Sequence, residues 1–475
     1  MSSPFVETHP TARAQRALAD ARPAVYWTDR PQLRPDPRPP LTGGGHRADL
    51  VVVGAGYTGL WTAVQALEEN PGRRVVVLDA GPVAIAASGR NGGFASPSLT
   101  HGLAQGLGLW PQDMPTIRRL EAENLAGWHA SIDGAGIDAE VHTPGEVTFA
   151  LREHEVDDLA EAVAEHREHG VEAELLDVDA CRAVVDSPLP LAGMRDPSVG
   201  LVDPARLAWG LAAHAERLGA QIHEGTEVLG LERAGTGVEV GTRWGSIRAD
   251  KVVLGTGAFR GLLRRSALFT LPVYDHVLMS EPLSATQLAQ VGWSGREGLT
   301  DAGNQFHYYR RTLDDRVLFG GYDANYHFPG RIDPALEQAG DSHALLAEHF
   351  LTLFPQLEGV RFTHRWAGVI DTTSRFTPVF GRALGGRVAY AIGYTGLGVV
   401  STRFGARVAL DLVDGVESER TSLAMVRRPP VPFPPEPLRW AAVRATRGAL
   451  ARADRTGRRG PLLATMDRFG VGFDS

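Results

Sequence analysis

The stretch VVVGAGYTGL carries the clearest chemical signal in the chain. It places Gly54, Gly56 and Gly59 in a G-x-G-x-x-G pattern directly after an apolar run that is typical of a buried strand. Glycines at this spacing allow a tight turn, a close approach of the backbone to a pyrophosphate, and close packing of the next helix on the strand. The free N–H groups at the start of that helix, at Tyr57 and Thr58, favour phosphate. The stretch therefore predicts a dinucleotide site.

An acidic residue completes this pattern at the end of the next apolar run. Asp79, followed by Ala80, stands twenty residues after Gly59. A carboxylate at that place can accept hydrogen bonds from the hydroxyls of the adenosine ribose. An acid there favours an unphosphorylated ribose, and so NAD or FAD rather than NADP. A purely structural turn is the alternative.

Two later glycine segments favour FAD over NAD. The run KVVLGTGAF ends an apolar strand in a tight turn, although an ordinary turn between strand and helix is the alternative. The run IGYTGLGVV precedes a helix expected from about Ser401, whose N-terminus would stabilise the negative charge of a reduced flavin. FAD is long and bent between domains, so it suits a second glycine–helix segment. The residues predicted here to contact FAD are Gly255, Thr256, Gly257, Gly393, Thr395, Gly396, Leu397, Gly398 and Val399.

The soft stretch ASGRNGGF begins eight residues after Asp79, where the chain must return from the adenosine end towards the flavin. Its glycines let backbone N–H groups approach the cofactor, its arginine offers charge to the pyrophosphate, and its serine and asparagine offer hydrogen bonds. A solvent loop is the alternative. We predict a second FAD-binding segment that ends at Phe94, the first residue to face the substrate. Its contact residues are Ser88, Gly89, Arg90, Asn91, Gly92 and Gly93, and Val228 in a later strand is also predicted to contact FAD.

The elements that must position these segments predict an α/β fold with an α+β second domain. A Rossmann-like FAD-binding domain assembled from discontinuous segments would carry an inserted substrate domain with an antiparallel sheet. The chain would begin with an extended proline-rich arm, pinned to the body by Tyr26 and Trp27, and end in a basic tail. The predicted ranges are 1–47 for the arm, 48–140, 195–265 and 365–420 for the FAD-binding domain, 141–194 and 266–364 for the substrate domain, and 421–475 for the tail.

Composition narrows the classes of function. The net charge of −8 argues against nucleic acid as the main partner. No uninterrupted apolar stretch is long enough to span a membrane, and the first twenty residues lack the apolar core of a secretory signal. Cys181 is the only cysteine, which excludes internal disulfides, and the histidines show no spacing typical of a metal site. We expect a cytoplasmic protein without a metal. Its only lysine is Lys251.

Taken together, these motifs resemble those of a known family. The N-terminal fingerprint, ASGRNGGF, GTGAF, HRWAGVIDTTSRFTPVFG and GYTGLGV are similar to the D-amino-acid-oxidase-like FAD-dependent oxidoreductases over about residues 48–420. Within that superfamily the resemblance is to the branch of gamma-glutamylputrescine oxidoreductase and the glycine and sarcosine oxidases. The resemblance implies that a flavin oxidises a carbon–nitrogen bond by hydride transfer to its N5, and that the imine is then hydrolysed.

The run FHYYRR supplies residues that are candidates for lining a substrate site. As a strand it places Phe306, Tyr308 and Arg310 on one face. The resemblance to monomeric sarcosine oxidase puts Tyr308 on an active-site tyrosine, and the charge of Arg310 could bind a carboxylate. Trp366 resembles a residue near the flavin in this branch. We predict these three as catalytic residues; the alternatives are a half-buried aromatic strand, a solvated arginine and a core tryptophan.

The chain departs from the sarcosine-type pattern at three positions. In an ungapped register, the lysine that assists oxygen falls on Phe319, an active-site histidine on Asp323, and the lysine that holds the substrate carboxylate on Val400. These departures put in doubt both O2 as the acceptor and an α-amino acid as the substrate. No cysteine lies near Gly368 and no histidine lies within residues 82–100, so non-covalent FAD is predicted.

We therefore expect an FAD-dependent enzyme that oxidises a primary or secondary amine, for example a polyamine derivative such as gamma-glutamylputrescine. Its electrons would pass to O2 or to another acceptor, and the oligomeric state is left open. The alternatives are an amino-acid oxidase of the D-amino acid, glycine or sarcosine type, a quinone-linked dehydrogenase, and a non-catalytic flavin-binding protein.

Overall fold

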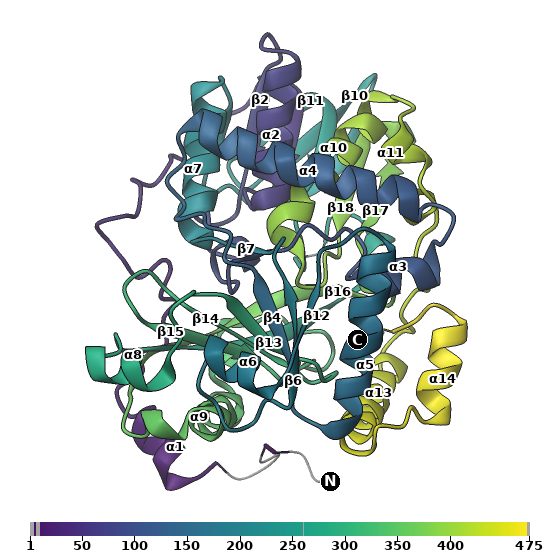
Figure 1. Ribbon diagram of the computed structural model, residues 1–475. Helices are drawn as coiled ribbons and strands as arrows, with labels where there is room; N and C mark the ends of the chain where they lie inside the picture. Colours follow the sequence, from purple (N-terminus) through teal and green to yellow (C-terminus); the bar gives the residue numbers. More distant parts are fainter. Residues whose placement is uncertain (1–3, 6–9, 260, 473–475) are drawn as a thin grey trace.

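The computed structural model describes residues 4–5, 10–259 and 261–472. Residues 1–3 and 6–9 of the predicted arm, residue 260, and residues 473–475 of the predicted tail lie outside the described residues. Two eight-stranded sheets organise the molecule, one in the upper half of Figure 1 and one in the lower half. None of the helices in this described part of the chain is long and apolar enough to cross a membrane.

The first sheet carries the glycine segments. β1 pairs in parallel with β2 and with β11, so the carboxyl ends of these three strands meet at one edge, directly before Gly54, Asp79 and Gly255. Its core strands are rich in buried valine, whose branched side chain suits a sheet that is covered on both faces. The strand order is β17 (Val379–Ala383), β18 (Val388–Ile392), β11 (Gly245–Leu254), β1 (His46–Val53), β2 (Val75–Leu78) and β8 (Gln221–His223), with β10 (Gly237–Thr242) and β9 (Val228–Ala234) extending from β11.

Helices that lie far apart in the sequence cover this sheet together (Figure 1). They are α2 (Tyr57–Glu69), α4 (Met114–Ala135), α7 (Pro204–Arg217) and α10 (Gly398–Asp414). The start of α7 illustrates the local rules, because the Asp203 carboxylate accepts hydrogen bonds from the N–H groups of Ala205 and Arg206, and Pro204 occupies the first turn. α10 packs on α2 and α4, which fixes the late glycine segment beside the first one.

The second sheet is mainly antiparallel, as the sequence predicts. Its order is β16 (Phe362–Thr373), β12 (Thr270–Ser280), β15 (Val317–Gly321), β14 (His307–Arg311), β13 (Gly298–Asp301), β4 (Glu146–Ala150), β6 (Ala192–Asp196) and β5 (Glu174–Leu176). On one face Tyr308, Val277 and Trp366 join the hydrophobic core of the FAD-binding half. On the other face Tyr309 and Phe319 pack in a separate core with α9 (Ser342–Leu353). The second sheet therefore turns one face towards the first sheet and its glycine loops.

Two of the predicted domain boundaries fall inside strands of this sheet. The boundary at 365 lies within β16, which pairs with β12 from Phe362 to Thr373. The boundary at 195 lies within β6, which pairs with β4. Both strands are held by hydrogen-bond ladders that local composition does not reveal.

The described parts of the N-terminal arm and of the C-terminal tail pack on the body. The predicted arm is not extended throughout, because α1 (Ala12–Ala17) forms within it and packs on α9. Tyr26 and Trp27 are buried, with 7% and 1% of their surface exposed. The tail forms α13 (Leu438–Thr456) and α14 (Pro461–Arg468), the yellow helices of Figure 1. The remaining elements are α3 (Leu103–Leu109), α5 (Glu153–Glu168), α6 (Val178–Val184), α8 (Ala285–Val291), α11 (Glu419–Ser422), α12 (Ala424–Arg427), β3 (Phe94–Ala95) and β7 (Gly200–Leu201).

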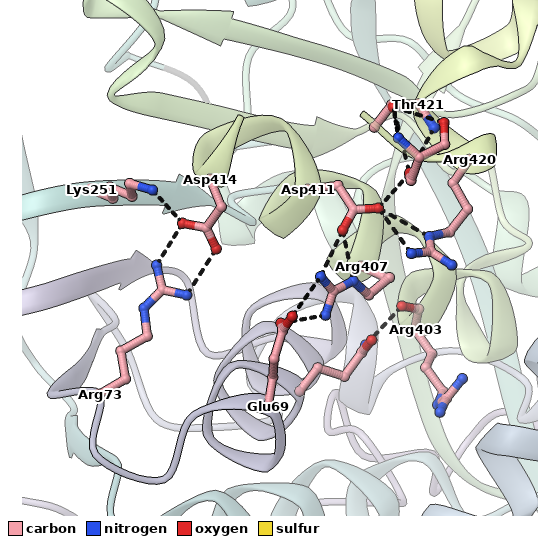
Figure 2. Close-up of polar contacts among 11 residues, drawn as sticks. Glu69, Arg73, Lys251, Arg403, Arg407, Asp411, Asp414, Arg420 and Thr421 are labelled. Carbon is pink, nitrogen blue, oxygen red and sulfur yellow. Dashed lines mark hydrogen bonds and ion pairs between the residues drawn. The ribbon is translucent and has the colours of Figure 1, made fainter. Parts of the chain in front are cut away.

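An ion-pair network fastens the far end of α10 (Figure 2). The fully buried Asp411 carboxylate accepts hydrogen bonds from Arg407 and Arg420, and Arg407 also pairs with Glu69 of α2. Nearby, Asp414 binds Arg73 at 3.0 Å and Lys251 at 2.6 Å. The only lysine of the chain therefore serves the scaffold.

Candidate active site

The first glycine loop is packed too tightly for any other residue. Gly54 has a φ of +102°, and a Cβ added to it would lie 2.5 Å from the carbonyl oxygen of Gly255. A Cβ on Gly59 would lie 1.8 Å from the carbonyl oxygen of Gly54. These contacts bring the turn after β1, the start of α2 and the turn after β11 together. The structure thus joins two of the predicted cofactor segments.

Asp79 lies at the edge of the same loop. Its Oδ2 accepts a hydrogen bond of 2.6 Å from the N–H of Ala55, and its Oδ1 accepts one of 2.8 Å from the N–H of Gly81. Burial raises the pKa of Asp79, while these two N–H groups act to lower it. The carbonyl oxygen of Asp79 accepts a hydrogen bond from the N–H of Thr226, two residues before Val228. Asp79 and the start of β9 therefore meet where the sequence predicts the adenosine end.

The second predicted segment lies against the start of α2. The Ser88 hydroxyl, in the short helix η1 (Ala87–Gly89), accepts a hydrogen bond of 2.9 Å from the N–H of Tyr57. The Asn91 side chain closes the turn, donating to the carbonyl oxygens of Ala87 and Ser88 and accepting from the N–H of Gly93. The segment is therefore a built turn beside the helix start, and the stretch that reads as a soft loop has a fixed place.

Arg90 makes contacts that the sequence does not predict. Its Nε donates to the carbonyl oxygen of Ile85 at 2.7 Å, and its guanidinium binds the carbonyl oxygen of Ala367 at 2.9 Å and Glu337 at 2.7 Å. These partners tie the second segment to β16 and to η3 (Pro334–Gln338). The predicted contact with a pyrophosphate would require these bonds to be exchanged.

The late glycine segment meets the middle one through β16. The N–H of Gly393 donates to the Asp371 carboxylate, and the Cβ position of Gly257 lies 3.9 Å from the same carboxylate. α10 begins at Gly398, three residues before the predicted start. Leu397 at its N-cap makes no side-chain hydrogen bond to the first turn, which leaves those N–H groups to an electron-rich ligand. The Thr395 hydroxyl accepts a hydrogen bond from the N–H of Thr373 and so anchors the loop.

Tyr308 stands between the two halves of the molecule. A Cβ on Gly92 would lie 2.7 Å from its ring, and a Cβ on Gly320 would lie 2.6 Å from its hydroxyl oxygen. The two glycines therefore clamp the tyrosine between the second segment and β15. Its hydroxyl donates a hydrogen bond to the Asp275 carboxylate, and Phe94 packs edge-on against its ring. The structure thus places Tyr308 and Phe94 together beside the cofactor segment.

Sequence reasoning missed Asp275. In the run PVYDHVLMS the neighbours Tyr274 and His276 attract attention as a shared strand face, and the acid lies on the opposite one. That opposite face carries Tyr308 and Trp366. An acid inside a mostly apolar strand was the signal to follow, because burying a charge costs free energy.

The other two predicted catalytic residues differ in character. Trp366 is buried, and its Nε1 donates a hydrogen bond of 2.9 Å to the carbonyl oxygen of Arg90. Arg310 is 1% exposed, and its guanidinium donates to the carbonyl oxygen of Val202 at 2.7 Å. Burial lowers the pKa of Arg310 to about 10. We therefore reassign Arg310 from substrate contact to positioning of the second segment, whose Gly93 lies against it.

The three departures from the sarcosine-type pattern also have defined places. Phe319 points into the core with α9. The residue that pairs with Tyr308 is Gly320, and both lie on the opposite face of the sheet from Phe319. No lysine stands at either position. Asp323 pairs with Arg447 of α13, and Val400 is fully buried in the core.

Comparison with known proteins decides the family. A family model described as FAD dependent oxidoreductase (DAO) matches residues 49–412. The chain belongs to this family. FAD is accordingly its cofactor, and the chain is an oxidoreductase of the class that acts on the carbon–nitrogen bonds of amines and amino acids.

Curated relatives and solved structures agree with this assignment. The oxidoreductase is 31% identical to a probable oxidoreductase OrdL of Haemophilus influenzae over 81% of this chain and 86% of the relative. It is 31% identical to the gamma-glutamylputrescine oxidoreductase of Escherichia coli over 81% of this chain and 88% of the relative. Its fold matches the crystal structure of glycine oxidase from Geobacillus kaustophilus with a TM-score of 0.68, at 21% identity, over 81% of this chain and 100% of the other.

The residues present fit FAD. Glycine cradles that a Cβ would fill, two helix starts and a carboxylate at the end of β2 converge on one edge of the first sheet. The donor groups suit a pyrophosphate and the electron-rich edge of a flavin, and the carboxylate suits a ribose.

Proposed function

We propose that this oxidoreductase oxidises the carbon–nitrogen bond of a primary or secondary amine that has no carboxylate on the reacting carbon. A mono-acylated diamine of the gamma-glutamylputrescine type is the proposed substrate class. The name of the E. coli relative, which is matched over 88% of its length, supports this choice. The two chains are 31% identical, so the name of the relative alone does not fix the substrate, and the choice also rests on the residues of the site.

The observation that carries the proposal is that Arg310, Arg90 and Lys251 are already bound to protein partners. The Arg310 guanidinium is buried and bonded to Val202, and Arg90 is paired with Glu337. Lys251 of β11 binds Asp414 at the C-terminal end of α10. A substrate carboxylate on the reacting carbon would need a free cation close to the reacting atoms, whereas a cationic amine meets Asp275 and Tyr308.

We assign the roles of the chain as follows. The segments Gly54–Gly59, Ser88–Gly93 and Gly393–Val399, together with Asp79, hold FAD by backbone N–H groups and one carboxylate. When bound, FAD supplies a two-electron acceptor for the hydride of the carbon next to nitrogen. Tyr308 and Trp366 exclude water and orient the amine, since oxidation at carbon needs a fixed approach and an amine nitrogen with a free electron pair.

Anaerobic reduction of the bound flavin tests this proposal. Purified holoenzyme is mixed without oxygen with a panel of putrescine, mono-acylated putrescine, N-methylated amines, glycine, sarcosine and D-alanine, and the flavin absorbance is followed. The proposal expects bleaching by amines that lack the carboxylate. Bleaching by the amino acids alone would contradict it.

A further inference from the structure

Asp275 of β12 lies beside a stretch of β16 that contacts two of the cofactor segments. At one end of this stretch of β16, Trp366 and Ala367 bind the Arg90 backbone and guanidinium; at the other end Asp371 binds the N–H of Gly393. At about 3.3 Å per residue this stretch is about 17 Å long. Gly368 lies within it, and Asp275 of β12 is its direct cross-strand partner. The carboxylate therefore lies between the second and the late FAD segments.

The space around this carboxylate is kept open by glycine. The Cβ position of Gly368 has only the Cβ of Arg90 within 4 Å, at 3.8 Å. The Cβ position of Gly320, across the ladder from Tyr308, is filled by the Tyr308 ring, so the open position is that of Gly368. Asp275 is half-buried. The backbone of Gly368 therefore leaves room beside the carboxylate, on the face that also carries Tyr308 and Trp366.

The Asp275 carboxylate is also held in a fixed direction. The Tyr308 hydroxyl donates to its Oδ2, and the backbone N–H of Gly321 acts to lower its pKa. Tyr308 cannot swing away, because Gly92 and Gly320 enclose its ring. A carboxylate fixed in this way can accept a further hydrogen bond from a cation.

Resting on the proposed function, we propose that Asp275 binds the ammonium group of the substrate and takes one of its protons, with Tyr308 as the positioning residue. One N–H bond breaks and one O–H bond forms on the carboxylate, and the electron pair stays on nitrogen. Bound FAD would accept the hydride of the neighbouring carbon, with both its electrons, while the nitrogen pair forms the C=N bond. The product leaves as an iminium ion, so charge and atoms balance.

The surroundings of Asp275 define its titration. Burial raises the pKa of Asp275 to about 7, against the hydrogen bonds from Tyr308 and Gly321, which lower it. Burial and the neighbouring acid raise the pKa of Tyr308 well above its usual value, so Tyr308 stays a donor. The charged groups on this face include Arg310 of β14, and Arg90 with its partner Glu337. The residue paired with Asp275 on β16 is Gly368, and Trp366 lies two residues before it.

Binding of an amine that cannot be oxidised isolates this role from turnover. The probe is tert-butylamine, which has no hydrogen on the carbon next to nitrogen, titrated into holoenzyme and followed by the flavin absorbance. Wild-type affinity should fall by about tenfold per pH unit below about pH 7, because only the ionised carboxylate attracts the cation. Asp275→Asn should bind at least about tenfold more weakly at pH 8 and lose the pH dependence.

Two further variants sharpen the result. Tyr308→Phe removes a hydrogen bond that lowers the pKa of Asp275, so the midpoint of the pH profile should move to higher pH. The matched control Asp158→Asn, an exposed acid on α5, should keep the wild-type profile. Asp275→Asn with wild-type affinity and pH profile, or Tyr308→Phe with an unmoved midpoint, would overturn the proposal.

The flavin reduction assay separates this inference from the proposed function. Suppose that amines reduce the flavin of the wild type and of Asp275→Asn at equal rates at every pH. This result would overturn the role of Asp275 and leave the proposed function standing. Wild-type flavin that no amine reduces would overturn the proposed function.

Discussion

Asp275 is an acid that the folded protein holds at a cost in stability. Its pKa in the folded protein is about 7, and an acid of this type has a pKa of about 3.9 in an unfolded chain. Between these values the folded state binds more protons than the unfolded state, so this residue makes stability fall as the pH rises from about 4 to about 7. Such a cost is typical of groups that serve chemistry and not folding.

The first prediction follows from this cost. Asp275→Asn keeps an acceptor for Tyr308 and removes the ionisation, so the variant should be more stable than wild type at pH 8 by roughly 1–3 kcal/mol. The difference should shrink towards pH 5. Denaturant unfolding of both proteins at several pH values measures it. A difference that does not change with pH would contradict the raised pKa.

The second prediction concerns Asp79. Asp79→Ala removes two hydrogen bonds to the glycine loop and the predicted contact with the ribose, so the Kd for FAD should rise by about tenfold to a hundredfold. Flavin fluorescence during titration of the apoprotein reports this Kd. Asp49→Ala serves as the control, since Asp49 lies on β1 but pairs with Arg74. Equal affinities in the two variants would count against a role of Asp79 at the cofactor.

Individual residues were predictable from sequence where the backbone itself dictates the residue type. Gly54 and Gly59 could be assigned to a turn and a close contact because only glycine allows them. Arg310 could not be placed, since strand periodicity gives a face but not whether a carbonyl such as that of Val202 waits there. Asp275 was missed because the residue that binds its carboxylate, Tyr308, is more than thirty residues away in sequence.

At the scale of elements, the N-terminal arm contributes to the cofactor segment. Trp27 Nε1 donates a hydrogen bond of 3.0 Å to the carbonyl oxygen of Asn91, and the guanidinium of Arg310 lies 5.6 Å from the Trp27 ring. Arg30 pairs with Asp203 at the start of α7. The arm therefore braces the turn Asn91–Gly93 from outside.

The third prediction tests this brace. Trp27→Phe removes one hydrogen bond to the second segment, worth about 1 kcal/mol, so the Kd for FAD should rise several-fold. Trp440→Phe, in the tail helix α13, should leave it unchanged. Equilibrium dialysis of FAD against the two variants measures the difference. Equal values would show that the arm does not support the cofactor segment.

The positions of helices and strands along the chain were more predictable than the pairing of the strands in the sheets. The strand FHYYRR and the strand–loop–helix of RVAYAIGYTGLGVV form as the sequence predicts, because apolar periodicity and glycine turns are local signals. The register between strands is not local, and a slip of one residue exchanges the two faces of a sheet. The structure places Gly320 directly across the ladder from Tyr308, a pairing that the sequence alone does not give.

At the scale of the whole molecule, the single lysine bears on which acceptor oxidises the reduced flavin. Lys251 is bound to Asp414, Arg310 is bonded to Val202, and the residue paired with Tyr308 is Gly320. A fixed cation that stabilises developing negative charge on oxygen is worth about a hundredfold in rate. The fourth prediction is that reduced enzyme reacts more slowly with O2 than with a quinone acceptor, as measured by stopped flow. Faster reaction with O2 would contradict it.

The attachment of FAD also follows from the whole chain. Cys181 is buried in the core with α9, and burial raises its pKa to about 11, so it is not poised for a bond to flavin. The fifth prediction is that acid precipitation releases FAD into the supernatant. Flavin that stays with the precipitate would show a covalent link.

The central claim is that this FAD-dependent oxidoreductase oxidises amines that lack a carboxylate on the reacting carbon. Its most direct test is a single anaerobic turnover of holoenzyme with mono-acylated putrescine, with glycine, sarcosine and D-alanine run in parallel. The account predicts that the acylated diamine bleaches the flavin and yields one aldehyde and one ammonia per flavin, while the amino acids leave it oxidised. Bleaching by the amino acids, with none by the amine, would contradict it.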